Sequence, residues 1–332
     1  MAEQHTPRSL IVTLYGAYGR ETAGSLAVAE LIRLLAAVGV DAPSVRSSVS
    51  RLKRRGLLEA RPTAAGAAGY ALSPDARQLL DDGDRRIYAH PAPQGEDGWV
   101  LAVFSVPESE RSKRHLLRSR LAGLGFGTAA PGVWLAPARL YDETRHTLER
   151  LQLAPYVDLF RGEHLGFAPT AEAVARWWDL PAIAKLHEDF LDRHEPVLRA
   201  WESRGGAGGG GGAGGAGGFG GTGAGDGGGA EGDGDGGGSA GAGGDGGAGG
   251  HGDAGGRAGA AYRDYLLALD SWRRLPYADP GLPAELLPRD WPGGRSAEVF
   301  GRLHAMLRDA GAPFVRDALP GRGSRPPRTM TR

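Results

Sequence analysis

The sequence predicts an α+β protein of several domains, and three patterns along its 332 residues support this prediction. Residues 1–90 space their apolar side chains as helices do and then contain two short strand-like runs. Residues 98–168 alternate strand-like and helix-like segments. Residues 169–204 and 260–312 return to helical spacing, so we expect a helical C-terminal domain there. A chain of this length can contain two or three small domains.

The composition excludes several classes of protein. The chain has 39 basic and 39 acidic residues, so any surface that binds a polyanion must be local. It has no cysteine, which excludes disulfides, zinc–thiolate sites and cysteine nucleophiles. The N-terminus lacks a signal-peptide core, and no apolar run approaches the roughly 18 residues of a membrane span. We expect a cytoplasmic protein with no membrane partner.

Residues 205–259 form a glycine-rich insertion with 34 glycines. Such a segment has little to bury and loses much conformational entropy on ordering, so we expect it to be disordered. It lacks the regular three-residue repeat of collagen. A phosphate-binding loop is also a poor interpretation, because no strand precedes the glycines and no Gly-Lys-Ser/Thr follows them. The arginine-rich tail at 313–332 is expected to be disordered as well.

Two helices are predicted before residue 40. Thr6 and Pro7 start the first one, because a hydroxyl cap followed by proline is typical of a helix N-terminus. Ser25 is the candidate cap of the second helix, and Gly39 ends it.

A third helix is predicted from its cap at Asp41 to the stop at Gly56. Val45, Val49 and Leu52 form one narrow stripe, which must face the other two helices. Two strand-like runs follow, "LLEAR" and "GYALS", joined by a segment rich in turn residues. Three helices and a hairpin are the layout of a winged helix-turn-helix, which places its last helix in the major groove of DNA. We assign residues 1–90 to this domain.

The other face of the third helix carries the side chains that reading DNA requires. Base edges are approached by short polar side chains and arginine, and phosphates by longer cations. The base-edge candidates are Ser44, Arg46, Ser47 and Ser50. The phosphate candidates are Arg51, Lys53, Arg54, Arg55 and, on the hairpin, Arg61. Between Asp41 and Arg61 there are six basic residues and two acids, too few acids for an ordinary solvated face. We therefore predict binding to double-stranded DNA.

The N-terminal segments "PRSLIVTLYGAYGR", "LIRLLAAVGVDAPSVRSSVSRLKRRGLL" and "GYALS" resemble a known family. They are similar to the N-terminal domain of the PaaX family, repressors of phenylacetic-acid catabolism. The most specific part is the V-R-S-x-x-S-R-L-x-R-R-G-x-L run. The later block "WRRLPYADPGLPAELLPRDWPG" resembles the C-terminal domain of the same family.

Residues 98–168 predict a ferredoxin-like βαββαβ domain. This order resembles the Cas2-like middle domain of the PaaX family. Because Cas2 proteins can be metal-dependent nucleases, such an enzyme remains an alternative. A nuclease site needs carboxylates at the end of the first strand, where this chain has Ser105, and Glu108 lies beyond a proline. We therefore expect no catalytic site, and a scaffold or dimer role for this domain.

The family resemblance implies an effector, an aryl-acyl-CoA such as phenylacetyl-CoA, that releases the repressor from DNA. Such a ligand needs an apolar or aromatic pocket for its ring and arginine or lysine for its pyrophosphate. The candidates are Trp177, Trp178, Trp272, Arg273 and Arg274. The alternative is that these tryptophans are core residues and these arginines lie on the surface.

The segment "HEDFLDRHE" contains two histidines and several acids but lacks the H-E-x-x-H spacing of zinc proteases. We expect neither a metal site nor a cofactor. The sequence thus predicts a homodimeric repressor that binds a near-palindromic operator. A winged helix that binds another protein instead of DNA is a further alternative.

Overall fold

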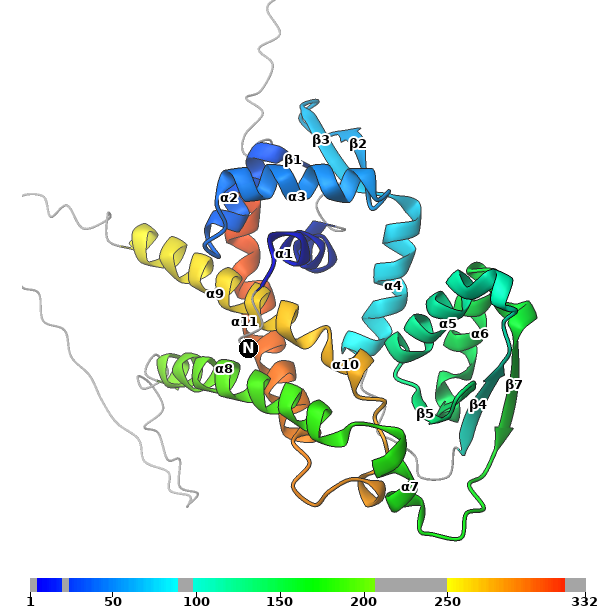
Figure 1. The fold of residues 1–332 in the computed structure, drawn as a ribbon. Coiled ribbons are helices and arrows are strands. Elements are labelled where there is room, and N and C mark those ends of the chain that lie inside the picture. The colour runs from blue at the N-terminus through cyan, green and yellow to red at the C-terminus, as the bar shows by residue number, and fades with distance from the viewer. Residues whose placement is uncertain (1–4, 20–23, 89–97, 207–249, 320–332) are drawn as a thin grey trace, which may run out of the picture.

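The computed structural model describes residues 5–19, 24–88, 98–206 and 250–319, and Figure 1 shows their arrangement. Among these residues the strands form two sheets, of three and four strands, and helices make up most of the rest. The predicted α+β class is confirmed. No helix in the described part of the chain is long and apolar enough to cross a membrane.

The N-terminal region has the predicted winged helix-turn-helix arrangement. Its helices are α1 (Pro7–Leu14), α2 (Val28–Ala36), α3 (Ala42–Arg54) and α4 (Pro74–Tyr88). Its strands are β1 (Ser25–Ala27), β2 (Leu58–Pro62) and β3 (Ala68–Leu72), in the antiparallel order β1-β3-β2. The predicted cap of α1 is confirmed, because the Thr6 hydroxyl oxygen accepts the Ser9 N–H at 3.1 Å.

Two local predictions in this region differ from the structure. Ser25 does not cap a helix: it lies in β1 opposite Ala71, and its hydroxyl donates to the Pro62 carbonyl at 2.7 Å. The second helix begins only at Val28. A three-residue strand is too short to leave a period in the sequence, so pairing with β3 decides its structure. The helix α4 was not predicted either.

The middle region forms the predicted ferredoxin-like domain. In chain order its elements are β4 (Trp99–Phe104), α5 (Arg111–Gly123), β5 (Gly127–Ala130), β6 (Val133–Pro137), α6 (Tyr141–Arg150) and β7 (Val157–Gly162). The strands pair antiparallel in the order β5-β6-β4-β7. Leu117, Leu121 and Leu148 of α5 and α6 pack on one face of this sheet.

The C-terminal region is helical, as predicted, but its boundaries differ from those expected. Its helices are α7 (Thr170–Trp177), α8 (Leu180–Gly206), α9 (Gly250–Trp272), α10 (Leu275–Ala278) and α11 (Gly293–Ala318). Both ends of the predicted insertion, 205–206 and 250–259, therefore belong to helices. Residues 207–249 lie outside the described residues.

The first residues of the predicted disordered tail are also helical. The helix α11 continues through Pro313 to Ala318, because Val315 and Ala318 are each only 3% exposed and pack in the core. The prediction for residues 313–318 was wrong, since these two apolar contacts outweigh the low apolar content of the tail as a whole. Residues 320–332 lie outside the described residues.

The winged helix and the C-terminal helices share one hydrophobic core. Buried side chains of α1, α2 and α3 form a single cluster with those of α8, α9 and α11. Hydrogen bonds also join these regions: among them, Tyr18 donates to the Arg308 carbonyl, and Arg33 donates to the Ala318 carbonyl. The described parts of the predicted ranges 1–90 and 260–312 therefore pack together around this core.

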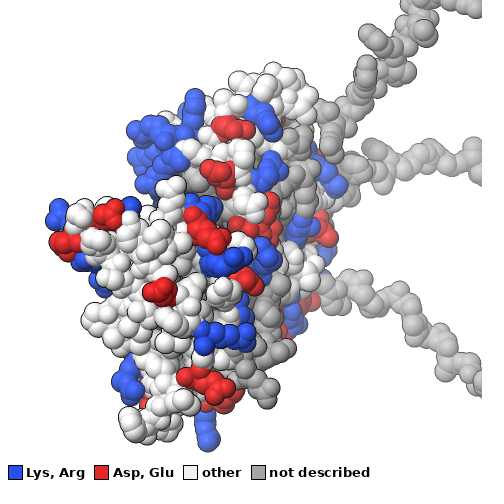
Figure 2. Space-filling view, turned by 90° about the vertical axis from the view of Figure 1, so that its right-hand side faces the viewer, with Lys and Arg blue, Asp and Glu red and all other residues white. Residues whose placement is uncertain are grey.

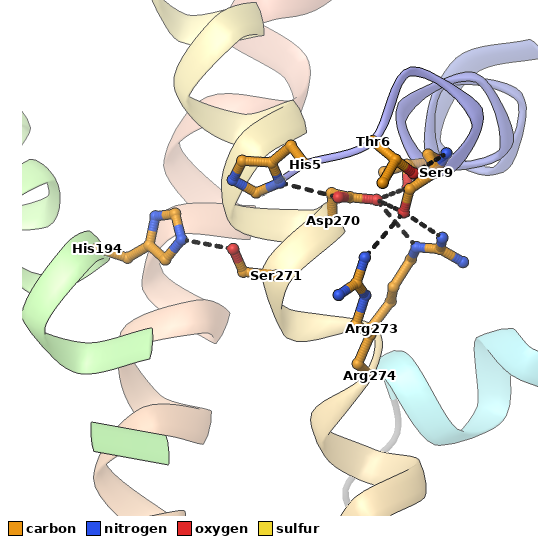
Figure 3. Close-up of polar contacts among 9 residues, drawn as sticks. His5, Thr6, Ser9, His194, Asp270, Ser271, Arg273 and Arg274 are labelled. Carbon is orange, nitrogen blue, oxygen red and sulfur yellow. Dashed lines mark hydrogen bonds and ion pairs between the residues drawn. The ribbon is translucent and has the colours of Figure 1, made fainter. Parts of the chain in front are cut away.

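A buried carboxylate fixes α1 against α9 (Figure 3). Asp270 of α9 accepts hydrogen bonds from Ser9 at 2.5 Å and from Thr13 at 2.7 Å, both on α1. His5 Nδ1 lies 2.8 Å from the same carboxylate, and Arg273 lies 3.3 Å from it. Burial alone would raise the pKa of Asp270, but the hydrogen bonds and the charge of Arg273 outweigh it and hold that pKa below its usual range. Asp270 is therefore ionised.

Asp270→Asn is expected to lower the free energy of unfolding by about 3 kcal/mol at pH 7, because it removes one partner of a buried, hydrogen-bonded charge. Guanidinium denaturation measures this, with Asp309→Asn on the exposed side of α11 as the matched control. The stabilisation is fully present above the unfolded pKa of about 3.9 and is lost as the pH falls through the lower folded pKa. Equal midpoints for both variants would contradict the anchoring role.

Candidate nucleic-acid interface

The helix α3 presents the face that the sequence predicts. Its cap is Asp41, whose two carboxylate oxygens accept the Ser44 N–H at 2.8 Å and the Ser44 hydroxyl at 2.7 Å. These hydrogen bonds lower the pKa of Asp41. Val45, Val49 and Leu52 are buried in the shared core. The opposite face of α3 is consequently turned to solvent.

Most of the predicted DNA-binding residues are gathered on that exposed face. The exposed members on α3 and the residue after it are Arg46, Ser47, Ser50, Arg51, Lys53, Arg54 and Arg55. Arg61 is exposed on β2 of the hairpin. Figure 2 shows a cluster of basic side chains in the upper part of the molecule, at the level of α3 in Figure 1. Ser44 differs from the others, because it is half-buried and its hydroxyl is used by the cap.

The hairpin is held close to the C-terminal end of α3. The ammonium group of Lys53 lies 5.9 Å from the ring centroid of Tyr70 on β3, within range of a cation–π interaction. The Tyr15 hydroxyl, from the π-helical turn at Tyr15–Gly19, donates to the Tyr70 carbonyl at 2.5 Å. Helix, hairpin and core are thus connected through one tyrosine.

A further basic residue, Arg8 of α1, belongs to this surface and was missed by the sequence analysis. Together with Arg51, Arg54 and Arg55 it lines a hollow of about 290 Å³. No acidic side chain among the described residues forms an ion pair with these four arginines. Sequence spacing could not predict this role for Arg8, because Arg8 lies 43 positions before Arg51. The packing of α1 against α3 brings the two residues together.

The five effector candidates are not brought together in one pocket. Trp272 is 1% exposed in the shared core, where it stacks on Phe300 and its indole N–H donates to the Ile87 carbonyl at 3.0 Å. Trp177 and Trp178 instead pack around Trp99, in a separate cluster on the four-stranded sheet. These three tryptophans therefore pack in hydrophobic clusters, as expected if they are core residues and do not bind an effector.

The two arginines of that set contact α1 and not the tryptophan cluster. Arg273 donates to the Ser9 hydroxyl oxygen at 2.8 Å, and Arg274 donates to the same oxygen at 3.3 Å (Figure 3). They belong to the polar cluster around Asp270.

The histidines of the "HEDFLDRHE" segment are structural. His194 lies 3.0 Å from the Ser271 hydroxyl, and burial, aided by the charge of Arg193, lowers its pKa to about 3. In the part of the chain that is described, no cluster of three or more histidines and acids could hold a metal ion. Ser105, the residue where a nuclease would need an acid, donates its backbone N–H to the Tyr156 carbonyl.

A hydrogen-bonded serine–histidine–aspartate triad was not expected from the sequence. His187 lies 2.6 Å from the Ser296 hydroxyl and 2.9 Å from a carboxylate oxygen of Asp279. Hydrolases use this combination, but their serine must be open to substrate. Ser296 is 0% exposed and its one hydroxyl proton is donated to the Gly293 carbonyl, so these three residues join α8 to the start of α11.

The comparisons with known proteins agree with this architecture along most of the chain. Family models match residues 6–76 (PaaX-like protein), 92–174 (PaaX protein central Cas2-like domain) and 253–317 (PaaX-like protein C-terminal domain). The chain is 22% identical over 310 residues to the transcriptional repressor PaaX of Escherichia coli (strain K12), which covers 92% of this chain and 82% of that protein. A solved structure, the uncharacterized protein Rv0674 from Mycobacterium tuberculosis, is similar with a TM-score of 0.51 and 20% identity. This match covers 94% of this chain and 98% of that one, and it supports the fold.

Arg273→Ala is expected to lower the free energy of unfolding by about 1–2 kcal/mol, because it removes charged hydrogen bonds to Ser9 and Asp270. Chemical denaturation measures this. Arg263→Ala is the matched control, since Arg263 lies on α9 and pairs with Asp264 at the surface. If both substitutions left the unfolding midpoint unchanged, Arg273 would not contribute to the α1–α9 junction.

Proposed function

Because this chain belongs to the PaaX family, we propose that it is a transcriptional repressor that binds double-stranded DNA through α3 and the β2–β3 hairpin. The single observation that carries this proposal is the exposed face of α3. This face presents serines and five cations from Arg46 to Arg55, and the helix itself contains no acid. A major groove lined by acceptors and flanked by phosphates is the partner such a face fits.

The two halves of α3 have different roles in this proposal. Arg46, Ser47 and Ser50 contact base edges, because they are exposed on the helix ahead of its last turn. The phosphate contacts come from its C-terminal end and the hairpin, through Arg51, Lys53, Arg54, Arg55 and Arg61. Ser44 contributes through the cap, since its hydroxyl is bonded to Asp41.

The protein acts as a cytoplasmic homodimer in this proposal. A two-fold dimer presents two copies of α3 to successive major grooves, about 34 Å apart, and reads a near-palindromic operator. Its effector is an aryl-acyl-CoA such as phenylacetyl-CoA, which relieves repression of aromatic-acid catabolic genes. The similarity to the E. coli transcriptional repressor supports the repressor role. The five effector residues expected from the sequence do not form a site in common.

Two alternative functions can each be recognised by a specific test result. A metal-dependent nuclease on the ferredoxin-like domain would cleave an oligonucleotide in the presence of Mg²⁺ or Mn²⁺. A winged helix that binds a protein would lose DNA affinity on Arg46→Ala and keep its partner. The exposed cations of α3 lie outside the ferredoxin-like domain, and they suit phosphates. They therefore favour a DNA-binding repressor over both alternatives.

The direct test is fluorescence anisotropy with the DNA upstream of the protein's own gene, random duplex as competitor and phenylacetyl-CoA as titrant. Preferential binding that the thioester abolishes, with coenzyme A as control, supports both repressor and effector. Preferential binding that is indifferent to the thioester retains the repressor and rejects the effector. No preference over random duplex rejects the groove-reading role of α3.

Arg54→Ala is expected to weaken binding to all duplexes alike and to reduce the slope of log K against log salt by about one, because it removes one phosphate contact. Binding titrations at several salt concentrations measure the slope. Arg302→Ala, on α11 and paired with Glu202, is the matched control. A slope equal to that of the wild type would reject the phosphate contact.

Arg46→Ala or Ser50→Ala is expected to cost about 1–3 kcal/mol on the operator and much less on random duplex, because a lost base contact removes discrimination. Competition between operator and single-base variants identifies the position that is read. A uniform loss on every duplex would instead place these residues against the phosphate backbone.

A further inference from the structure

The hollow between α1 and α3 contains more positive charge than one backbone phosphate neutralises. Arg8, Arg51, Arg54 and Arg55 line it, and each guanidinium is charged at all physiological pH values. A DNA phosphodiester carries a single negative charge. Because none of the described acids pairs with these arginines, the excess charge is not compensated within the described part of the protein.

The size and lining of the hollow favour a compact anion. Its volume of about 290 Å³ is close to the lower end, roughly 300 Å³, of small-molecule pockets. The lining consists of arginines, which present planar forks of N–H donors that bind phosphate oxygens in pairs. None of the four lining residues is apolar or aromatic, so the hollow favours phosphate groups over an aromatic ring.

The position of Arg8 is determined by the core. Arg8 is followed by Ser9, which is 7% exposed and hydrogen-bonded to Asp270, Arg273 and Arg274. Arg51 and Arg54 lie in the last turn of α3, on either side of the fully buried Leu52. Cations at a helix C-terminus are also stabilised by the helix dipole. The donors therefore face the hollow from two helices whose backbones are already anchored, so only the side chains have to be ordered on binding.

We propose that this four-arginine hollow is a binding site for a small molecule that carries two or more phosphate groups, and that this ligand competes directly with DNA. The competition rests on the proposed DNA-binding function, because Arg51, Arg54 and Arg55 are also its phosphate contacts. Occupation of the hollow neutralises these cations and covers the end of α3. Release from DNA then requires no change in the fold.

The first experiment is calorimetric titration of the DNA-free, full-length protein with inorganic pyrophosphate, at ionic strength held constant with sodium chloride. Arg8→Ala and Arg54→Ala remove donors from the hollow. Arg46→Ala is the matched control, since it removes the same charge from the exposed face of α3 outside the hollow. Sulfate, with one anionic group, is the control ligand. Denaturation curves verify that each variant is folded.

The expected result is saturable binding of pyrophosphate that Arg8→Ala and Arg54→Ala each weaken about tenfold or more, while Arg46→Ala changes it by less than about twofold. Arg8→Lys should recover part of the affinity, because it restores the charge without the paired donors. No saturable binding, or an equal loss in Arg8→Ala and Arg46→Ala, would overturn the proposal.

A second experiment separates this inference from the proposed function. Pyrophosphate and sulfate are titrated, at matched ionic strength, against the protein bound to its operator. Displacement by pyrophosphate well below the concentration needed for sulfate supports competition at the hollow. DNA binding that pyrophosphate does not displace would overturn the competition and leave the repressor intact. Absence of DNA binding would reject the proposed function, while the calorimetric result would still decide the anion site.

Discussion

The buried carboxylate of Asp270 is the constraint on which the arrangement of the DNA-binding face depends. It lies on α9, yet two of its hydrogen-bond donors, Ser9 and Thr13, lie on α1. A charge buried to this degree is tolerated only when its acceptor positions are filled, so α1 must keep its rotation and its position along α9. Because α3 packs on α1, the same constraint places the exposed face of α3.

The hydrophobic core fixes the rest of the N-terminal region against the C-terminal helices, as Asp270 fixes α1. The helices α9 and α11 approach so closely that a side chain at Gly311 would meet the backbone of Tyr262 at 2.8 Å. Tyr18 packs against Tyr262 and Tyr265 at this crossing, with ring centroids 5.8 and 6.1 Å away. The winged helix is thus part of a larger body and not a module on a tether. The helix α1 contacts both the C-terminal helices and the basic hollow, so it is the element common to the two regions.

The ferredoxin-like domain is attached to this body by polar contacts as well as apolar ones. Arg86 of α4 forms an ion pair of 2.7 Å with Glu143 of α6 and donates to the Leu124 carbonyl. Arg139 donates to the carbonyls of Pro280 and Gly281, and the Trp178 indole donates to the Gly125 carbonyl. These contacts connect the domain to both sequence neighbours and distant segments. Figure 1 accordingly shows α5 beside the end of α4.

The elements with strong local signals could be predicted from the sequence alone. Capping residues at Thr6 and Asp41 and the apolar stripe of α3 depend on neighbours within a few positions, so spacing alone predicted them. The exposed basic face of α3 followed from the same stripe. The βαββαβ order was equally visible, because each strand and helix has its own period. The family resemblance rested on these same segments.

Contacts between residues far apart in the chain became visible only in the folded structure. It placed Arg8 beside the arginines of α3 and Arg273 and Arg274 against Ser9. It separated Trp272 from Trp177 and Trp178, which belong to a different hydrophobic cluster. It also made a strand of Ser25–Ala27 and a helix of residues 313–318. In each case a contact over long sequence separation outweighs a weak local preference, and such contacts leave no period or spacing from which they could be read.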